Sequence, residues 1–275
     1  MIYIYTTVHP GSKFFFKEFI NTINLQSFKK FKLFICFNKI RFSNFFKNKI
    51  KVDFSYLENN KDQRRARIDS LKYLLKKDPE LIVFIDSDDL MNKNRLAYIV
   101  KNIKNYDFFV HNLLLFGNNY KKKTRWLKKR NFSLIKMSEI NYKNYIGLSN
   151  LAVKGFALKK VIDKIGTNLI AFDWCLAKLL LLNKYKGIYS SASLSQYRQY
   201  NYNISNLTNY SKLKLFKDLK IKLQHLNFFN KLGLNYNKKI NKLISLKKKI
   251  KLDSYYMKYK KKISNKHTGY WWSYP

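Results

Sequence analysis

Three carboxylates lie within four positions, directly after the most apolar run of the chain. Asp86, Asp88 and Asp89 follow residues 81–85 (LIVFI), and this run predicts a strand that is buried on both faces. Carboxylates this close repel one another, and burial raises the cost of their charge. A divalent cation would offset both effects, because Mg²⁺ and Mn²⁺ prefer carboxylate and phosphate oxygens. We therefore expect Asp86 and Asp88 to hold a metal. The alternative is a solvated turn in which Asp89 caps the next helix.

Strands and helices alternate around this carboxylate cluster. The pattern of apolar residues predicts strands over 1–8, 31–37, 50–57, 81–85 and 107–116, and helices up to about 28, over 63–77 and over 93–104. Such alternation predicts an α/β fold with a parallel, doubly wound sheet. Ligands of these sheets bind beyond the carboxyl ends of the strands, which is where the cluster stands.

The second half of the chain predicts a change of organisation. Residues 118–145 are basic and irregular, helices are expected over 155–165 and 172–184, and a strand over 186–194. From about 206, leucine and lysine recur at helical spacing up to about 250. We therefore expect an α/β domain that carries the carboxylate cluster over 1–205 and a basic, mainly helical appendage over 206–275.

The charge of the chain is extreme. There are 56 Lys and Arg against 16 Asp and Glu, a net charge of +40, which first suggests a nucleic-acid binder. Only 8 of the basic residues are Arg, whose planar fork is the usual reader of phosphates and base edges. Lys, Asn, Ile, Phe and Tyr share AT-rich codons, so a low-GC genome accounts for much of the charge. We expect no nucleic-acid partner. A non-catalytic nucleic-acid-binding protein remains the alternative, although it leaves the carboxylates unexplained.

Several features bear on location. Cys36 and Cys175 lie in apolar runs and predict core thiols. The chain shows no signal-type leader, and no apolar run approaches the ~20 residues that span a bilayer. These features predict a cytoplasmic protein. The basic segment 206–262 could in addition hold it at the inner face of an anionic membrane, or form an ordinary helical pair with solvated lysines. Trp271 and Trp272 could sit at a membrane, stack on a sugar or pack.

Five segments, taken in their order along the chain, match a known pattern. They are residues 5–7 (YTT), 63–71 (QRRARIDSL), 84–90 (FIDSDDL), 171–176 (AFDWCL) and 195–205 (SQYRQYNYNIS). In this order they resemble the family-two inverting glycosyltransferases, over residues 1 to about 205. The resemblance implies a GT-A, Rossmann-like fold with a mostly parallel sheet flanked by helices.

The resemblance also implies roles for individual residues. Asp88, with Asp86, would bind Mn²⁺ or Mg²⁺ at the diphosphate of a nucleotide-sugar donor, and Asp86 could instead contact the ribose. Asp173 would be the catalytic base toward a hydroxyl of a glycan or lipid-linked acceptor, as in polysaccharide biosynthesis. The remaining nucleotide-sugar contacts implied by the resemblance come from Thr6, Thr7, Arg67 and Arg198.

The sequence departs from the family pattern at three places. Asn38 stands near the usual position of an Asp that holds the base, Phe172 replaces an acidic residue, and Tyr200 replaces a common His. Asp173 could also cap the helix that it begins. Arg64 and Arg65 are interpreted as solvated helix residues.

Two other enzyme classes share part of this pattern. A phosphatase of the haloacid dehalogenase type carries paired Asp residues on its first strand and Thr or Val at the position of Leu90, whereas this cluster follows the fourth predicted strand. A degenerate transferase that binds a sugar nucleotide without turning it over remains open.

Overall fold

The computed structural model describes residues 1–117, 120, 122–200, 211–264 and 271. One mixed sheet runs through the molecule in the order β3-β2-β1-β4-β9-β6-β10-β5, with β7 beside β6 and β8 beside β10. The strands are β1 (Ile2–Val8), β2 (Phe31–Asn38), β3 (Phe54–Asn59), β4 (Leu81–Phe84), β5 (Leu90–Met91), β6 (Phe108–Gly117), β7 (Thr124–Arg125), β8 (Ser133–Leu134), β9 (Leu151–Lys154) and β10 (Gly187–Gln199).

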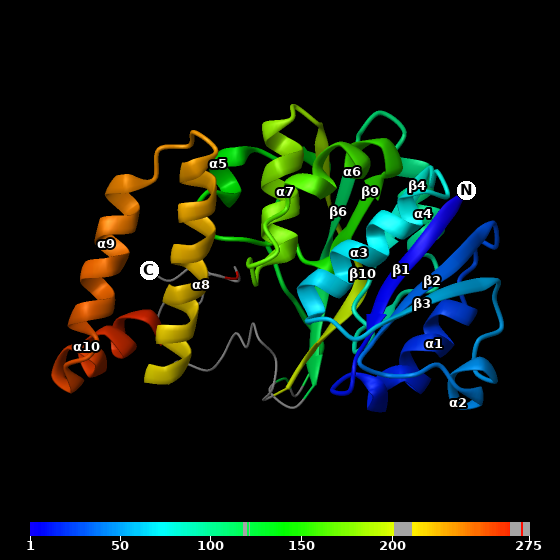
Figure 1. Cartoon of the computed structure of the whole chain (residues 1–275), viewed down its shortest axis with the longest axis horizontal. Coiled ribbons are helices and arrows are strands. Elements are labelled where there is room, and N and C mark those ends of the chain that lie inside the picture. The colour runs from blue at the N-terminus through cyan, green and yellow to red at the C-terminus, as the bar shows by residue number, and fades with distance from the viewer. Residues whose placement is uncertain (118–119, 121, 201–210, 265–270, 272–275) are drawn as a thin grey trace.

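Helices cover both faces of this sheet (Figure 1). The α-helices are α1 (Phe16–Asn24), α2 (Asn44–Lys47), α3 (Gln63–Leu75), α4 (Arg95–Asn102), α5 (Met137–Ile140), α6 (Gly155–Val161), α7 (Phe172–Leu182), α8 (Lys212–Lys231), α9 (Asn237–Lys249) and α10 (Asp253–Ser264). Short 3₁₀ turns are η1 (Lys13–Phe15), η2 (Leu148–Asn150) and η3 (Ile162–Lys164).

Two apolar cores lie between the sheet and the helices, one on each face of the sheet. Side chains of α1, α2 and α4 pack on one face of the sheet, and side chains of α3, α6, α7 and α8 pack on the other. The strand β1 is buried at every position because it lies between β2 and β4, in parallel with both. The expected α/β architecture, with a mostly parallel sheet flanked by helices and followed by C-terminal helices, is confirmed.

One central strand was not predicted. β9 runs antiparallel between β4 and β6, so the sheet is not parallel throughout as the alternation suggested. Its four residues (LAVK) are too short to show a strand period. The strand expected over 186–194 continues to Gln199, and the strand expected over 50–57 begins at Phe54.

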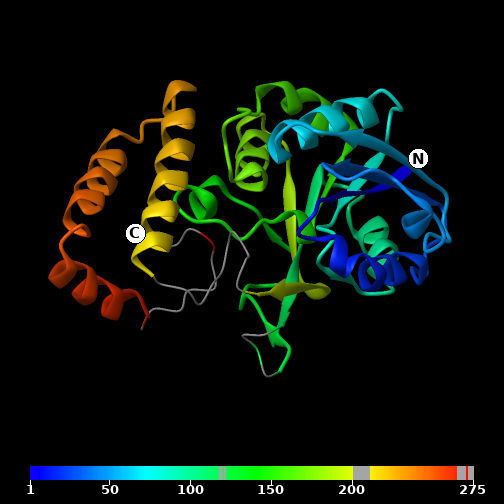
Figure 2. The same cartoon turned by 60° about the horizontal axis from the view of Figure 1, so that its bottom comes forward.

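The C-terminal helices pack against the sheet domain through α8. The imidazole of His225 stacks on the indole of Trp174, with ring centroids 3.8 Å apart, and Leu219 and Phe229 join the same core. α9 and α10 lie farther from the sheet (Figures 1 and 2). The division at residue 205 stays a prediction. None of the helices in the described ranges is both long and apolar enough to cross a membrane.

The start of α6 provides a test of this packing. A Cβ at Gly155 would stand 1.7 Å from the carbonyl oxygen of Pro79, a backbone atom that has little freedom to move. Gly155→Ala should therefore lower the free energy of unfolding by about 1–3 kcal/mol. Urea denaturation checks this, with Lys159→Ala, at an exposed position of the same helix, as the control. Equal stability of the two variants would contradict the packing.

Candidate functional site

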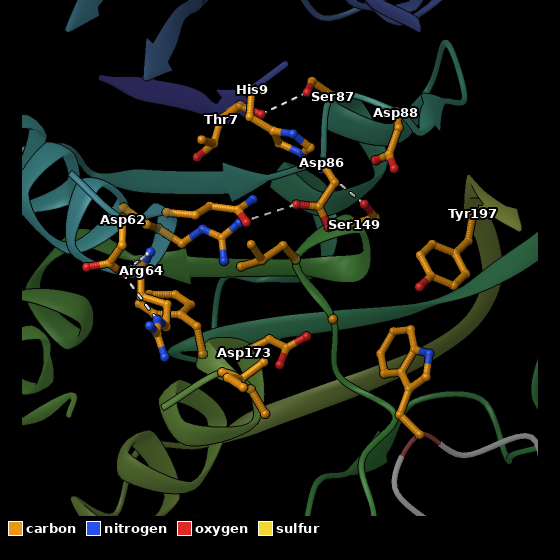
Figure 3. Close-up of a pocket in the computed structure, with 18 of the residues that line it drawn as sticks. Thr7, His9, Asp62, Arg64, Asp86, Ser87, Asp88, Ser149, Asp173 and Tyr197 are labelled. Carbon is orange, nitrogen blue, oxygen red and sulfur yellow. Dashed lines mark hydrogen bonds and ion pairs between the residues drawn. The ribbon is translucent and has the colours of Figure 1, made fainter. Parts of the chain in front are cut away.

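A cavity of about 500 Å³ lies beyond the carboxyl ends of β1 and β4. Distant segments line it: the ends of these two strands, the starts of α3 and α7, the turn η2 and the end of β10 (Figure 3). The chain after residue 205 adds Lys217 and Trp271. This is the edge of the sheet at which the sequence placed the carboxylate cluster.

Asp86 lines the cavity beside the guanidinium of Arg67. Its backbone N–H donates to the hydroxyl of Ser149 (3.0 Å), and its Oδ1 lies 3.7 Å from Nη2 of Arg67. Burial raises the pKa of Asp86 to about 7, Arg67 opposes the rise, and Asp88 and Asp173 add to it. The site therefore holds more negative charge than Arg67 offsets.

Asp88 lines the cavity above Asp86 (Figure 3). Its Oδ2 accepts a hydrogen bond from the hydroxyl of Tyr200 (2.8 Å). Burial, together with the nearby carboxylates, raises the pKa of Tyr200 above its usual value, so this hydroxyl stays a donor. His9 also lines the cavity, and burial lowers the pKa of its imidazole, which favours the neutral ring.

The residues present fit a hard divalent cation. Asp86 and Asp88 bring two carboxylates to the same cavity, where burial raises the pKa of Asp86, Arg67 opposes the rise and the charge of Asp88 adds to it. In the described ranges, no group of three or more His, Cys, Asp or Glu is placed to hold a metal. Mg²⁺ and similar ions are commonly bound by one or two carboxylates and completed by phosphate and water. The donor set thus suits a cation that arrives with a diphosphate.

Asp173 faces the same cavity from the first turn of α7 (Figure 3). Its Oδ1 accepts a hydrogen bond from the backbone N–H of Trp174 (2.7 Å). Burial raises its pKa to about 6, while the hydrogen bond to Trp174 and the charge of Arg67 oppose the rise. The helix has Ala171 as its N-cap residue, so the capping interpretation of Asp173 is wrong. A carboxylate with this pKa can accept a proton near neutral pH.

The two threonines of β1 lie on opposite faces of the sheet. Thr7 lines the cavity, and its hydroxyl lies 3.3 Å from that of Tyr5. Thr6 is fully buried, and its neighbours Ile4 and Val8 belong to the core under α1. Successive strand residues alternate in direction, so the side chain of Thr6 faces away from the cavity. Its predicted nucleotide contact can involve its backbone alone.

Arg198 contacts residues 86–89, which we call the carboxylate loop. Its guanidinium lies between the rings of Phe15 and Phe116, at 4.4 and 4.6 Å from their centroids, and donates to the carbonyl oxygen of Asp88 (2.8 Å) and to Glu18 (2.6 Å). Arg198 is not among the residues that line the cavity. Its predicted contact with the nucleotide stays a prediction, and the observed contacts are with the loop that carries Asp88.

Asp89 does not cap the next helix. α4 begins at Arg95 with Asn94 as its N-cap residue. The carboxylate of Asp89 is fully buried and accepts a hydrogen bond from the backbone N–H of Arg198 (2.7 Å). The capping interpretation of Asp89 is therefore wrong, and this residue joins the end of β10 to the carboxylate loop.

Several lining residues were missed from the sequence. Arg64 is a helix residue whose side chain is 37% exposed, as expected, but it also lines the cavity, and its guanidinium donates to Asp62 (3.2 Å) and to the carbonyl oxygen of Asn168 (3.1 Å). Arg65 is exposed, as expected. Ser149 comes from a segment without a recognisable pattern, and its contact with Asp86 depends on the tertiary fold. Trp271, for which packing was one of the alternatives, is buried in the wall of the cavity, whereas Trp272 lies outside the described residues.

The comparisons with known proteins concern the fold. No protein-family model and no curated protein sequence matches the chain. Among solved structures, it is similar to S. aureus TarS, with 19% identity and a TM-score of 0.56 over 83% of this chain and 43% of that one. The chain thus spans less than half the length of TarS. It is also similar to TarS residues 1–349 in complex with UDP-GlcNAc, with 17% identity and a TM-score of 0.57 over 83% of this chain and 71% of that one.

A third similar structure is the mannosyltransferase PcManGT from Pyrobaculum calidifontis in complex with GDP-Man and Mn²⁺. It is 12% identical, with a TM-score of 0.57 over 82% of this chain and 62% of that one. At such identities the similarity concerns architecture alone. The chain shares the fold of these glycosyltransferases.

Proposed function

We propose that the protein is a metal-dependent, inverting glycosyltransferase that moves a sugar from a nucleotide-sugar donor to a hydroxyl of a glycan or lipid-linked acceptor. The observation that carries the proposal is one cavity that brings Asp86, Asp88 and Arg67 together with Asp173. This cavity lies in a fold shared with enzymes crystallised with UDP-GlcNAc, or with GDP-Man and Mn²⁺.

The donor diphosphate takes the side of the cavity that carries the acidic pair and the guanidinium. Asp86 and Asp88 would hold Mn²⁺ or Mg²⁺, which neutralises the charge that develops on the departing nucleoside diphosphate. Arg67 is held near Asp86 by their ion pair and adds a fixed positive charge there. Thr7 and Arg64 line the same cavity and are proposed as contacts of the nucleoside.

Asp173 acts as the general base. It removes the proton of the acceptor hydroxyl as that oxygen attacks the anomeric carbon and the bond to the diphosphate breaks. Figure 3 shows Asp173 across the cavity from Asp86 and Asp88. This placement supports attack from the face opposite the leaving group, which inverts the anomeric centre.

The C-terminal helices supply a candidate membrane surface. Lysines are exposed along α9 and α10, together with Leu252 (66% exposed) and Met257 (59% exposed). Lysines with interspersed apolar side chains favour the headgroup region of an anionic membrane. We propose that this basic helical surface, residues 237–264, holds a cytoplasmic enzyme at the inner face of the membrane, where lipid-linked acceptors would lie.

Metal-dependent nucleotide binding tests the donor site. Calorimetric titration with UDP, GDP and CDP, each with and without Mn²⁺, should show one nucleotide whose binding needs the metal. Asp88→Ala should weaken that binding at least ~10-fold, about 1.4 kcal/mol, because it removes a proposed metal ligand. Asp163→Ala, at a side chain that is 73% exposed, is the matched control. Absence of nucleotide binding, combined with salt-sensitive binding of DNA or RNA, would favour the nucleic-acid alternative.

The pH dependence of turnover tests the base. With saturating metal and a sugar nucleotide that carries the base identified by calorimetry, the sugar is transferred to water and the nucleoside diphosphate is released. The rate of this release should rise with pH, reach half its maximum near pH 6 and level off above that, because Asp173 acts as its carboxylate. Asp173→Asn should lower kcat by ~10²–10⁴-fold and leave nucleotide affinity unchanged. Nucleotide binding without turnover in the wild type would indicate the degenerate transferase.

Vesicle sedimentation tests the basic helical surface. The protein should bind phosphatidylcholine vesicles that contain phosphatidylglycerol, and should not bind pure phosphatidylcholine. Replacing Lys242, Lys248 and Lys249 with Gln should weaken binding by up to about 1 kcal/mol per lysine, since these exposed side chains lie on α9. Gln at the exposed positions Lys29, Lys30 and Lys51, around β2, should leave binding unchanged. Equal loss in both triple variants would show a non-specific charge effect.

A further inference from the structure

Trp271 is tied into the wall of the cavity. Its backbone N–H and carbonyl oxygen pair with those of Asn144, at 2.8 Å in each direction. Asn144 is fully buried, and its side chain donates to the carbonyl of Ile146 (2.6 Å) and accepts from its N–H (3.0 Å). The position of Trp271 is therefore set by hydrogen bonds to a segment that is itself rigidly bonded.

The indole of Trp271 fills space that a glycine leaves open. A Cβ at Gly147 would stand 2.4 Å from Cη2 of Trp271, and the three nearest heavy atoms to it all belong to this ring. The backbone of Gly147, with φ −112° and ψ 171°, is open to any residue type. Position 147 therefore needs a glycine because a Cβ would collide with the indole, and not because of its backbone conformation.

Two further aromatic rings complete this wall. The centroid of Trp126 lies 4.2 Å from that of Trp271, and Tyr197 meets Trp271 edge to face at 5.4 Å and 76°. Trp271 is 6% exposed and Tyr197 is half-buried, and both line the cavity that contains Asp173. Figure 3 shows Tyr197 on the opposite side of the cavity from Arg64 and Asp62, with Asp173 between the two sides.

The two sides of Asp173 differ in chemistry. The part of the lining formed by Asp86, Asp88 and Arg67 is charged and suits a metal and a diphosphate. The side of Tyr197 and Trp271 presents an aromatic ring backed by a second one. Sugar rings carry apolar C–H faces that pack on aromatic side chains, and binding sites combine such surfaces with a few placed polar groups.

We propose that Tyr197 and Trp271 form the subsite for the acceptor, and that its ligand is a sugar ring whose hydroxyl faces Asp173. Tyr197 makes the contact with the ring. Trp271 is a positioning residue, because its indole supports Tyr197 and closes the cavity behind it. The inference rests on the proposed transferase function and adds the chemical class of the acceptor.

Saturation-transfer NMR with simple glycosides tests the subsite without turnover. The probes are the methyl β-glycosides of glucose, galactose and N-acetylglucosamine and methyl α-mannoside, each added with the nucleoside diphosphate that binds and with Mg²⁺, which is diamagnetic and leaves the proton signals sharp. In the full-length protein, at least one glycoside should receive saturation at its ring C–H protons. Trp271→Ala and Gly147→Ala should each reduce this signal roughly fivefold or more, the second because its new Cβ displaces the indole.

The double variant Gly147→Ala/Trp271→Ala tests whether Gly147→Ala acts by displacing the indole or by disturbing the fold in general. If Gly147→Ala acts through the indole, it should cause no further loss in the Trp271→Ala background. Trp271→Phe should retain part of the signal, and Phe156→Ala, at an aromatic side chain that is 56% exposed on α6, should retain all of it. Metal-dependent nucleotide affinity should stay unchanged in every variant.

Two results would overturn the inference. One is a glycoside signal that persists in Trp271→Ala and Gly147→Ala. The other is the absence of any glycoside signal from a wild-type protein that still binds nucleotide with Mn²⁺. A wild-type protein that binds no nucleotide would instead remove the proposed function, so the two failures are distinguishable.

Discussion

The balance of charge around Arg67 is the constraint on which the site depends. Asp86, Asp88 and Asp173 line one cavity, whereas Arg67 is the guanidinium that lies 3.7 Å from Asp86. Burial already raises the pKa of Asp86 to about 7 and that of Asp173 to about 6. β1 and β4 deliver these groups to the carboxyl edge of the sheet, where the proposed cation and diphosphate would have access to them. In the proposed function, the same excess of carboxylates that costs stability binds the metal.

The loop that carries Asp88 is held by three hydrogen bonds, which explains how unfavourable charges keep a fixed position. Arg198 donates to its backbone, Tyr200 donates to the carboxylate of Asp88, and the buried Asp89 accepts from the N–H of Arg198. All three come from one segment, because Arg198 lies near the end of β10 and Tyr200 directly follows this strand. A β10 that ended at 194, as predicted, would leave this loop without them, so its extra length is part of the site.

The sequence predicted the parts of the site that local patterns encode. The apolar run before Asp86, the helix that carries Arg67 and the helix that presents Asp173 all show a clear period or composition. That Thr6 and Thr7 point to opposite faces of the sheet follows from the alternation of side chains along a strand, so it could have been predicted from the sequence. β9 was not predictable, because four residues carry no period and its antiparallel pairing depends on partners far along the chain. The contact of Ser149 with Asp86, across 63 residues, depends on β9 in turn.

The chain after residue 205 contacts the aromatic side of the cavity, the proposed acceptor side, through two separate routes. Trp271 reaches the wall directly through Asn144 and Gly147. α8 acts through α7, where the ring of His225 stacks on Trp174, the residue next to Asp173. A helix packed between the sheet and a second helical layer cannot shift without disturbing both. The position of Asp173 and the shape of the aromatic wall therefore both depend on residues that follow the five sequence segments of the predicted glycosyltransferase pattern.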